Sequence, residues 1–502
     1  MQSTAREESE GQSETKSERG NERPPANAEK ARQRATTAPA AEDSVVVPPA
    51  VEEELPLPRA RLDYSALAER TDEMERNLRE RSMSGDARAL PLLLQAQKES
   101  ARALMEAREQ RNALTARLKD KSLPQAERLA LVAEGRALRV RTAALQTAAR
   151  TSDARLQRTA LELPNWVHPD APVGDETAAR VVTEEEGRSP LPPGSAGPPP
   201  EWWREHVQYA VDEGLVAFEE GAAVAGQKFV FLQREAALLE LALQQWALAR
   251  LLAFRPRRGG PFVPMAAPDM VLPSVSAACG FQPRGAHTQV YSVEGHRLCM
   301  VGTSEIPLVA RHADKILAGA ELPLRLAGFG HCFRAEAGSL GTASKGLYRL
   351  HQFSKVEMVV VAHPDHSEEL LEELRGIEEA LVRELELPFR VLDMPTADLG
   401  APATRKYDLE AWMPSRRAYG ELCSASNCTD YQSRRLNVRF RNEEGERPRF
   451  VHTLNATAVA VPRVILAILE NHQQPDGSVR IPKALHPYMH GITSIPCRSR
   501  SL

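Results

Sequence analysis

The chain has 502 residues, 42% of them hydrophobic, which is enough to bury a large core and favours two or three domains. The net charge of -4 hides differences between segments, so it excludes no class of partner by itself. Six scattered cysteines without a CxxC pair exclude a disulfide framework and a zinc site, and they indicate a reducing compartment. No run of about 18 apolar residues occurs, so we expect neither a transmembrane helix nor a membrane partner.

The first segment, residues 1–58, is rich in Ser, Glu, Arg, Pro and Ala and nearly lacks aromatic residues. It cannot bury enough apolar surface to offset its ordering entropy, so we expect a disordered leader. A mitochondrial targeting sequence is rich in Arg and Ser and poor in acids, whereas glutamates are frequent here. The composition alone therefore leaves the targeting function of the leader open.

Residues 59–165 are dominated by strong helix formers and contain almost no glycine. Leu131, Leu138 and Leu145 repeat every seven residues, and a similar apolar seam precedes them. Between the two seams, Ser122 is a candidate helix cap and Pro124 fits a first helical turn. The pattern predicts two long helices that form an antiparallel coiled-coil hairpin.

Basic residues outnumber acidic ones about two to one on this hairpin. They are Arg102, Arg108, Arg111, Arg117, Lys119, Lys121, Arg128, Arg136, Arg139, Arg141, Arg150, Arg155 and Arg158. A positive rod of this kind can follow a phosphate backbone. An ordinary solvated coiled-coil surface accounts for the same composition, so the charge alone does not decide between the two.

We interpret residues 166–200, with a Pro-rich stretch from Ser189 to Pro200, as a linker. From about Val181 onward, short β-rich runs alternate with helical ones, which predicts a single α+β domain that we assign to residues 201–490. The expected strands are Val356–Val361 and Phe389–Leu392, and the expected helices are Glu368–Glu386 and Ala458–Glu470. We interpret residues 491–502 as a tail.

Two neighbouring segments, Cys332–Gly338 and Gly346–Glu357, read as a strand, a Gly-containing loop and a second strand. They place Arg334, Phe353 and Glu357 on one sheet. Arginine offers a planar fork for phosphate, an aromatic ring offers a face for a base, and a buried carboxylate accepts a proton from a hydroxyl or ammonium group. A surface hairpin with ordinary ion pairs would explain any one of these residues alone.

Taken together, the two segments resemble motif 2 of class II aminoacyl-tRNA synthetases, in the form typical of seryl-tRNA synthetases. Thr453–Arg463, followed by Leu469–Gln473, resembles motif 3, a strand leading into a helix that carries an arginine. Phe262–Pro268 is similar to motif 1, with its proline before a dimer-interface turn. Further matches are Leu163–Asn165, Gly302–Glu305, Glu421–Cys428 and Asp476–Pro482, so the resemblance spans roughly Arg59 to Leu485.

The resemblance implies a catalytic domain built on an antiparallel β-sheet flanked by helices, and a homodimer. It also implies a serine pocket. Thr303 and Glu305 would hold the serine ammonium, Arg334 its carboxylate and Glu357 its hydroxyl, with Asn455 and Thr457 closing the pocket. Ser304 is a further implied serine-binding residue. A site that hydrogen-bonds a hydroxyl rejects alanine strongly, because its buried polar groups would be left unpaired.

The implied ATP contacts are Arg334, Ala335, Glu336, Leu350, Phe353, Glu421, Leu422, Cys423, Ser424 and Arg463. Among these, Arg334 would bridge the serine carboxylate and the α-phosphate, and Glu336 would read the adenine amino group. Phe353 and Arg463 would enclose the ring, and Glu421 and Ser424 would bind magnesium through oxygen. Arg334, Glu421 and Arg463 would be the catalytic residues, and no zinc is expected.

In this family a helical hairpin grips the long arm of the serine tRNA by shape and backbone, so tRNA binding becomes the preferred interpretation of the basic hairpin. The selenocysteine tRNA is a second candidate substrate. One departure is Cys423, where the family usually has serine; a backbone contact would survive this change and a hydroxyl contact would not.

The segment Tyr407–Pro414 and the ending near Tyr488 look bacterial or organellar in type. Together with the leader they favour the mitochondrial matrix over the cytoplasm as the location of the enzyme. Two other functions compete with an active synthetase. A synthetase-like RNA-binding protein should have lost ATP contacts, yet Arg334, Glu336, Glu421 and Arg463 are present. A ligase that charges a carrier protein should lack the helical hairpin.

Overall fold

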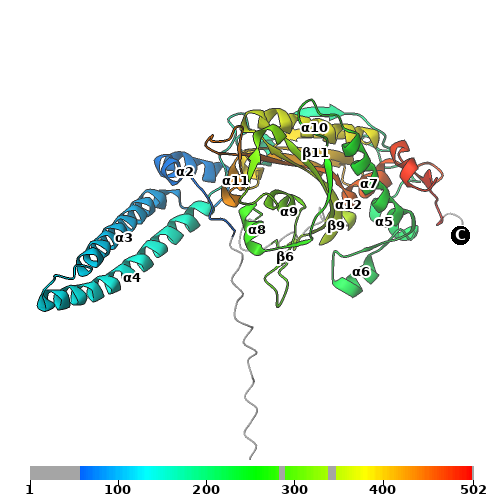
Figure 1. Ribbon diagram of the computed structural model, residues 1–502. Coiled ribbons are helices and arrows are strands. Elements are labelled where there is room, and N and C mark those ends of the chain that lie inside the picture. Colours follow the sequence, from blue (N-terminus) through cyan, green and yellow to red (C-terminus); the bar gives the residue numbers. More distant parts are fainter. Residues whose placement is uncertain (1–56, 282–288, 337–345, 500–502) are drawn as a thin grey trace, which may run out of the picture. The chain divides into compact units, whose positions relative to one another are not determined.

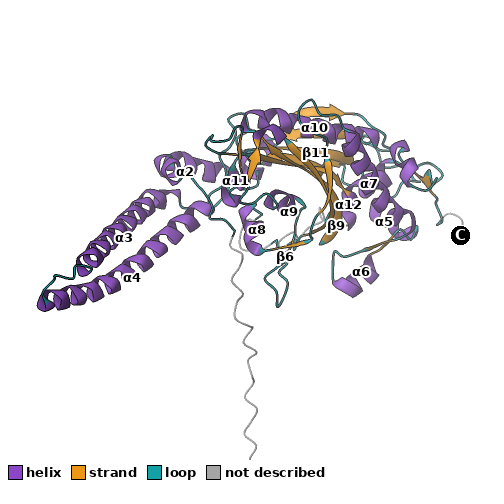
Figure 2. Cartoon of the chain, viewed as in Figure 1, coloured by secondary structure: helices purple, strands orange, loops and turns teal. Residues whose placement is uncertain are grey.

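The computed structural model describes residues 57–281, 289–336 and 346–499. Its centre is an eight-stranded sheet in the order β1-β10-β11-β12-β15-β9-β8-β4, antiparallel except for the parallel pair β4–β8 (Figures 1 and 2). The strands are β1 (Arg180–Glu185), β4 (Val263–Ala266), β8 (Leu324–Phe333), β9 (Gln352–Ala362), β10 (Phe389–Asp393), β11 (Arg405–Met413), β12 (Ala418–Asn427) and β15 (His452–Ala460). The predicted antiparallel sheet is confirmed.

Alternation along β9 explains why the sheet has two different faces. Val356, Met358 and Val360 pack into the main core, whereas Val359 and Val361 join a second, smaller cluster on the opposite face. Side chains in a strand alternate between the faces, so a run of β-branched residues can serve two cores at once. Lys355 and Glu357 share the face of the smaller cluster, whereas Ser354 bonds Glu240 of α7 on the opposite face.

Three helices pack against the strands in the main core: α7 (Arg234–Ala253), α10 (Ser367–Glu384) and α12 (Val461–Asn471). Pro462 stands in the first turn of α12, where its missing N–H has no cost. The smaller helices are α5 (His206–Asp212), α6 (Phe218–Ala225), α8 (Pro273–Ala278), α9 (Glu305–Ala310) and α11 (Tyr431–Leu436). The remaining strands are β2 (Val216–Ala217), β3 (Phe231–Leu232), β5 (Met270–Val271), β6 (Cys299–Met300), β7 (Ile316–Ala318), β13 (Arg439–Arg441), β14 (Arg449–Phe450), β16 (Val479–Arg480) and β17 (Ser494–Ile495).

The predicted helical hairpin is confirmed. After α1 (Tyr64–Glu69) and α2 (Thr71–Glu80), α3 (Leu90–Leu118) and α4 (Gln125–Leu161) run antiparallel (Figure 1). At about 1.5 Å per residue, the 37 residues of α4 extend roughly 55 Å. Leu131 and Leu138 are buried in the seam. Among the described residues, no helix combines the length and apolarity needed to cross a membrane.

A network of buried hydrogen bonds fixes the base of the hairpin. The Arg81 guanidinium, 1% exposed, donates to the carbonyls of Asn165 (2.7 Å) and Ala403 (3.0 Å). The Asn165 amide donates to the carbonyl of Cys428 (2.9 Å). Carbonyl groups at a chain turn need donors when they are buried, and these side chains supply them. The hairpin is thereby joined to the loop that leads into α11.

Three local expectations were wrong. Ser122 does not cap α4: its backbone N–H and hydroxyl both bond the Asp120 side chain, and Pro124 occupies the N-cap position. Residues 458–460, expected to be helical, complete β15, because α12 begins only at Val461. The presumed linker 166–200 contributes β1, which pairs with β10 at the edge of the sheet.

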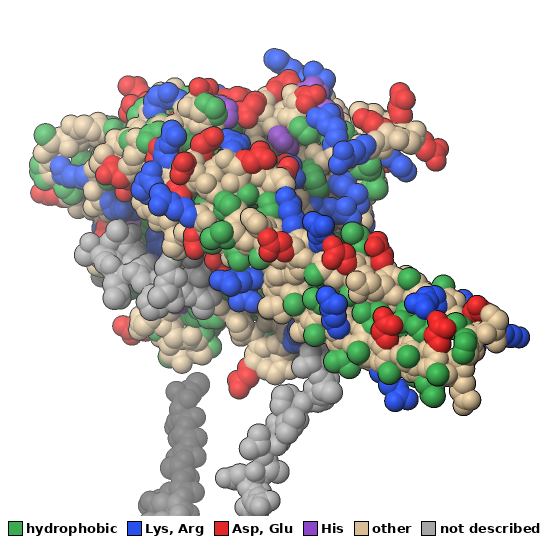
Figure 3. Space-filling model, turned by 90° about the vertical axis from the view of Figure 1, so that its left-hand side faces the viewer, with side chains coloured by type: hydrophobic (Ala, Val, Ile, Leu, Met, Phe, Trp, Pro, Cys, Tyr) green, Lys and Arg blue, Asp and Glu red, His purple; other side chains and the backbone are tan. Residues whose placement is uncertain are grey.

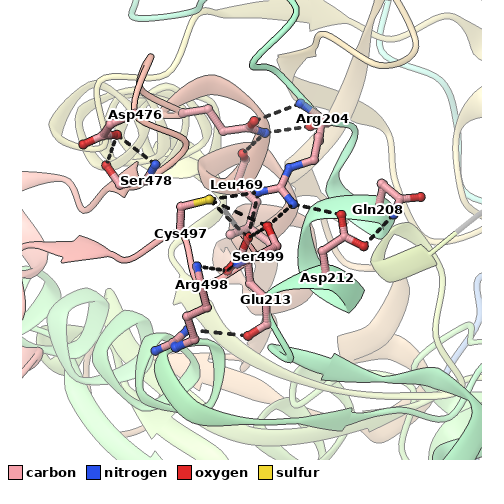
Figure 4. Close-up of polar contacts among 11 residues, drawn as sticks. Arg204, Gln208, Asp212, Glu213, Leu469, Asp476, Ser478, Cys497, Arg498 and Ser499 are labelled. Carbon is pink, nitrogen blue, oxygen red and sulfur yellow. Dashed lines mark hydrogen bonds and ion pairs between the residues drawn. The ribbon is translucent and has the colours of Figure 1, made fainter. Parts of the chain in front are cut away.

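The expected tail is folded back onto α5 through Glu213 (Figure 4). The Glu213 carboxylate, 1% exposed, accepts from Arg204 Nη2 at 2.8 Å, from the Ser499 hydroxyl at 2.6 Å and from the backbone amides of Arg498 and Ser499. Burial raises the pKa of Glu213, and these donors outweigh burial and bring it to about 2. The carboxylate is therefore a charged anchor for the C-terminal segment.

Candidate functional site

Two β-bulges shape the polar face of the sheet. The first bulge lies in β12. Leu409 of β11 pairs with Cys423 of β12, and the next residue of β11, Glu410, pairs with Glu421, which leaves Leu422 as an extra residue. One extra residue reverses the alternation of side chains along a strand. Glu421 and Ser424 therefore share one face, although they are three residues apart.

The second bulge lies in β15, where Thr457 pairs with Glu357 and Val459 pairs with Val356, which leaves Ala458 as the extra residue. The backbone N–H of Thr457 bonds Oε1 of Glu378, a fully buried residue of α10, at 3.1 Å. Burial raises the pKa of Glu378 well above its ordinary value. A carboxylate from the helical side of the sheet thus supports the bulge beside Glu357.

The polar face opens into a cavity. Thirteen of the residues predicted from the sequence line it: Thr303, Glu305, Arg334, Glu336, Leu350, Phe353, Glu357, Glu421, Leu422, Ser424, Asn455, Thr457 and Arg463. They come from the start of α9 and the turn before it, from the segment between β8 and β9, and from β9, β12, β15 and α12. Residues spread over 160 positions of the sequence therefore meet in one cavity.

At one end of the cavity, carboxylates and amides gather around a small volume. Lys355 pairs with Glu357 and donates to the Thr303 hydroxyl at 3.0 Å. The Asn455 amide donates to Glu305 Oε1 at 3.0 Å. Burial raises the pKa of Glu305 to about 7, against the opposing effects of the Gln432 amide and nearby cations. This end suits a small molecule that carries both a cation and a hydroxyl group.

At the other end, guanidinium groups lie over aromatic rings. Arg334 lies 5.4 Å from the ring centroid of Phe353, and Arg463 lies 4.7 Å from that of Tyr348. Arg463 also donates to the Glu421 carbonyl at 2.8 Å and pairs with its carboxylate at 3.2 Å. Positive charge beside an aromatic surface is the combination expected for the phosphates and base of a nucleotide.

Glu336 lines the cavity in a fixed orientation. It adopts a positive φ of 48°, unusual for a residue with a side chain, and Arg349 Nη1 bonds its Oε2 at 2.7 Å. A carboxylate held in this way can accept a hydrogen bond from an amino group of a ligand.

The oxygen atoms beside Glu421 fit a hard divalent cation. Glu421, Ser424 and Asp408 lie on the same face of paired strands. Burial raises the pKa of Glu421, but the charges of Arg463, Lys406 and Arg334 reverse this and hold it below its usual value. Asp408 Oδ1 is buried without a hydrogen-bond partner. Magnesium prefers such oxygen donors and keeps its other positions for water and phosphate. Within the described residues, no group of three or more His, Cys, Asp and Glu side chains is arranged to enclose a metal ion.

Three predicted residues lie outside the cavity lining. Ser304 is buried at the start of α9. The backbone N–H of Ala335 donates to the Gln289 carbonyl at 3.0 Å. Cys423 is 2% exposed and packs into the main core on the opposite face. The bulge explains this outcome for Cys423, because it turns the thiol away and leaves only the backbone near the cavity.

Four residues that the sequence did not single out contribute to the site: Lys355, Tyr348, Arg349 and Gln432. Lys355 stands two positions before Glu357 on the same strand, so alternation would have placed it on the same face. Gln432 had no such signal, because it reaches Glu305 from α11, more than 120 residues later in the sequence.

Two protein-family models match the chain. Residues 289–472 match the class II core domain of tRNA synthetases (G, H, P, S and T), and residues 62–167 match the seryl-tRNA synthetase N-terminal domain. The serine–tRNA ligase of Treponema denticola is 42% identical over 85% of this chain and 98% of its own length. The serine–tRNA ligase of Rubrobacter xylanophilus is 43% identical over 85% of this chain and 97% of its own length.

Solved structures agree with this relationship. The seryl-tRNA synthetase of Pyrococcus horikoshii complexed with ATP superposes with a TM-score of 0.76 and 35% identity, covering 87% of this chain and 99% of that one. The cytoplasmic serine–tRNA ligase of Naegleria fowleri in complex with AMP superposes with a TM-score of 0.70 and 28% identity, again over 87% of this chain and 99% of that one. With both domains matched in order and nearly the full length of the relatives covered, this chain belongs to the seryl-tRNA synthetase family.

Proposed function

We infer that this protein is a serine–tRNA ligase, which activates serine with ATP and transfers it to tRNA(Ser). The observation that carries this inference is a single cavity that joins a carboxylate-rich end around Glu305 and Glu357 to a guanidinium-rich end around Arg334 and Arg463. Relatives that cover most of the chain carry the same name, and a structural relative was solved with ATP.

In the first step, a carboxylate oxygen of serine attacks the α-phosphorus of ATP. The bond to the β-phosphate breaks, and seryl-adenylate and pyrophosphate form. The charge of Arg334 acts on Glu305 at one end of the cavity and on Glu421 at the other, so its guanidinium can neutralise both the attacking carboxylate and the α-phosphate. Little covalent chemistry falls to the protein, and alignment of the two substrates supplies much of the rate enhancement.

Serine selection follows from the pairing at the carboxylate-rich end. Glu305 and Thr303 bind the ammonium group in this proposal, and Glu357 accepts the hydroxyl proton, with Asn455 and Thr457 closing the space. Alanine would leave the Glu357 carboxylate buried without a hydroxyl partner, so it is rejected by a large factor.

Nucleotide binding uses the opposite end. Phe353 and Arg463 enclose the adenine, and Glu336 accepts a hydrogen bond from its amino group. Leu350 and Leu422 line the pocket, and Ala335 and Cys423 contribute only through their backbone beside it. Glu421 and Ser424 bind magnesium, which supplies charge neutralisation at the phosphates when bound. Zinc has no part in this proposal, and activity should survive a zinc-selective chelator.

In the second step, a hydroxyl of the terminal ribose of tRNA attacks the carbonyl carbon of seryl-adenylate, the ester forms and AMP leaves. The hairpin of α3 and α4 holds the tRNA in this proposal. Viewed from the hairpin side, Lys and Arg side chains are scattered among acidic and apolar ones (Figure 3). This mixed surface favours contacts to the shape and backbone of RNA over readout of individual bases. The selenocysteine tRNA is included as a second substrate.

We further propose a homodimer, formed around the motif 1 segment Phe262–Pro268, and a location in the mitochondrial matrix. Two exposed apolar residues, Val263 within this segment and Met270 just after it, support an apolar interface. The bacterial relatives support an organellar origin, with the cytoplasm as the alternative location. Sedimentation of the purified chain and imaging of a full-length fluorescent fusion test these two proposals.

The decisive experiment is ATP–pyrophosphate exchange with purified protein and each of the twenty amino acids. Serine is expected to support exchange at least a hundredfold faster than alanine. Charging of tRNA(Ser) and tRNA(Sec) transcripts is then measured with labelled serine. Faster exchange with another amino acid would overturn the assignment.

A further inference from the structure

Gln432 holds Glu305 from outside the cavity. It is the second residue of α11 and is fully buried, and both the nitrogen and the oxygen of its side-chain amide are hydrogen-bonded. Its amide nitrogen donates to Glu305 Oε1 at 2.6 Å and to the Cys279 carbonyl at 3.0 Å. Its amide oxygen accepts from the Thr453 hydroxyl at 2.7 Å. The side chain therefore has one orientation, and that orientation presents an N–H to the carboxylate.

The charges around Glu305 explain why this contact matters. Glu357, a like charge, and burial both disfavour the ionised form, whereas Lys355, Arg334 and the Gln432 amide favour it. The buried thiols of Cys279 and Cys428 also lie near Glu305. Lys355 pairs with Glu357, and Arg334 donates to the Gly302 carbonyl, so neither cation is held by Glu305 alone. A donor to a buried carboxylate favours its charged form and fixes its position.

The short helix α11 is itself anchored on its other side. Arg435 is buried and donates to the carbonyls of Leu161 (3.3 Å) and Leu163 (3.2 Å) at the base of the hairpin. A helix of six residues has little stability of its own, so such tertiary contacts hold it. Gln432 thus projects from an element fixed to both domains.

We propose that Gln432 is a positioning residue for serine binding, which aligns the Glu305 carboxylate with the ammonium group of the substrate. This role rests on the proposed function, because it assumes that Glu305 binds serine. Gln432 does not line the cavity, so it acts only through Glu305.

Gln432→Met removes the amide and keeps a similar length. Its KM for serine in pyrophosphate exchange should rise about tenfold or more, as expected for a lost hydrogen bond to a charged group. The KM for ATP and the rate at saturating serine should change less than twofold. The acid limb of kcat/KM for serine should move to higher pH, because Glu305 then ionises less readily.

Thr453→Val is the second variant. It removes the hydroxyl that orients Gln432 and leaves Glu305 untouched, so it should raise the KM for serine by a smaller factor in the same direction. Ser433→Ala is the matched control, since Ser433 lies on the same helix, is fully buried and donates to the Val451 carbonyl instead. Its KM for serine should equal that of the unmodified protein.

The outcomes separate the two inferences. The role of Gln432 alone would be overturned if folded Gln432→Met and Thr453→Val kept an unchanged KM for serine. It would also be overturned if the KM for ATP rose as much as the KM for serine. Absence of serine-dependent exchange and of serine binding by calorimetry in the unmodified protein would overturn the proposed function and this inference with it.

Discussion

In the proposed serine pocket, the buried carboxylate of Glu305 makes substrate binding sensitive to pH. Its pKa is raised to about 7, chiefly by burial, so the charged form is lost as pH falls below 7. The serine ammonium remains charged throughout this range. We therefore expect kcat/KM for serine to decline about tenfold per pH unit well below 7, while the KM for ATP stays nearly constant. Pyrophosphate exchange measured from pH 5.5 to 8.5 checks this, and an acid limb near pH 4.5 would show that Glu305 behaves as an ordinary glutamate.

The same scale shows which site residues the sequence can predict. Arg334, Phe353 and Glu357 stand close together along two paired strands, so their shared face follows from local spacing. The orientation of Cys423 depends on a bulge, which alternation does not reveal. Gln432 depends on the tertiary placement of α11, and no local pattern signals it.

At the scale of elements, we expect the hairpin to serve the second chemical step alone. The tip of α3 and α4 lies far along the chain from the cavity residues, whereas Arg81 and Asn165 dock only its base. Deleting residues 101–151 and joining the helices with a short turn keeps that base, because Ser100 and Ser152 face each other across the hairpin and Leu156 and Ala160 stay in its core. We expect the variant to lose tRNA charging by more than a hundredfold and to keep pyrophosphate exchange within about threefold. Equal loss of both activities would contradict this separation.

The elements also differ in how far the sequence predicts them. The heptad spacing of Leu131 and Leu138 predicts α4 because a long helix depends on a repeated local pattern. Strand β1 was hidden in a presumed linker, because its partner β10 follows some 200 residues later. Pairing over such a distance is fixed by the folded sheet and leaves little trace in the strand itself.

At the scale of the whole molecule, Glu213 joins two distant parts of the chain. Its pKa falls from 4.5 in the unfolded chain to about 2, so its stabilising effect is complete above pH 4.5 and is lost as pH falls toward 2. We expect Glu213→Gln to lower the free energy of unfolding at pH 7 by about 2 kcal/mol, the scale of hydrogen bonds to a charged group. Urea unfolding measures this change.

Hydrogen exchange gives a local readout of the same contact. The backbone amides of Arg498 and Ser499, which donate to Glu213, should exchange faster in Glu213→Gln. Asp212→Asn is the matched control, because Asp212 also pairs with Arg204 but contacts neither amide. Unchanged exchange at Arg498 and Ser499 would show that the carboxylate does not hold the C-terminal segment.

The extra residue Leu422 makes the binding surface depend on the backbone path of β12 as well as on its amino acids. If β12 ran as a regular strand with Leu422 retained, strict alternation would put Glu421 and Ser424 on opposite faces of the sheet. Every amino acid of the binding surface would still be present, yet one of the two oxygen ligands would point away from the cavity. A homologous strand that lacks the extra residue should therefore also lack the bulge.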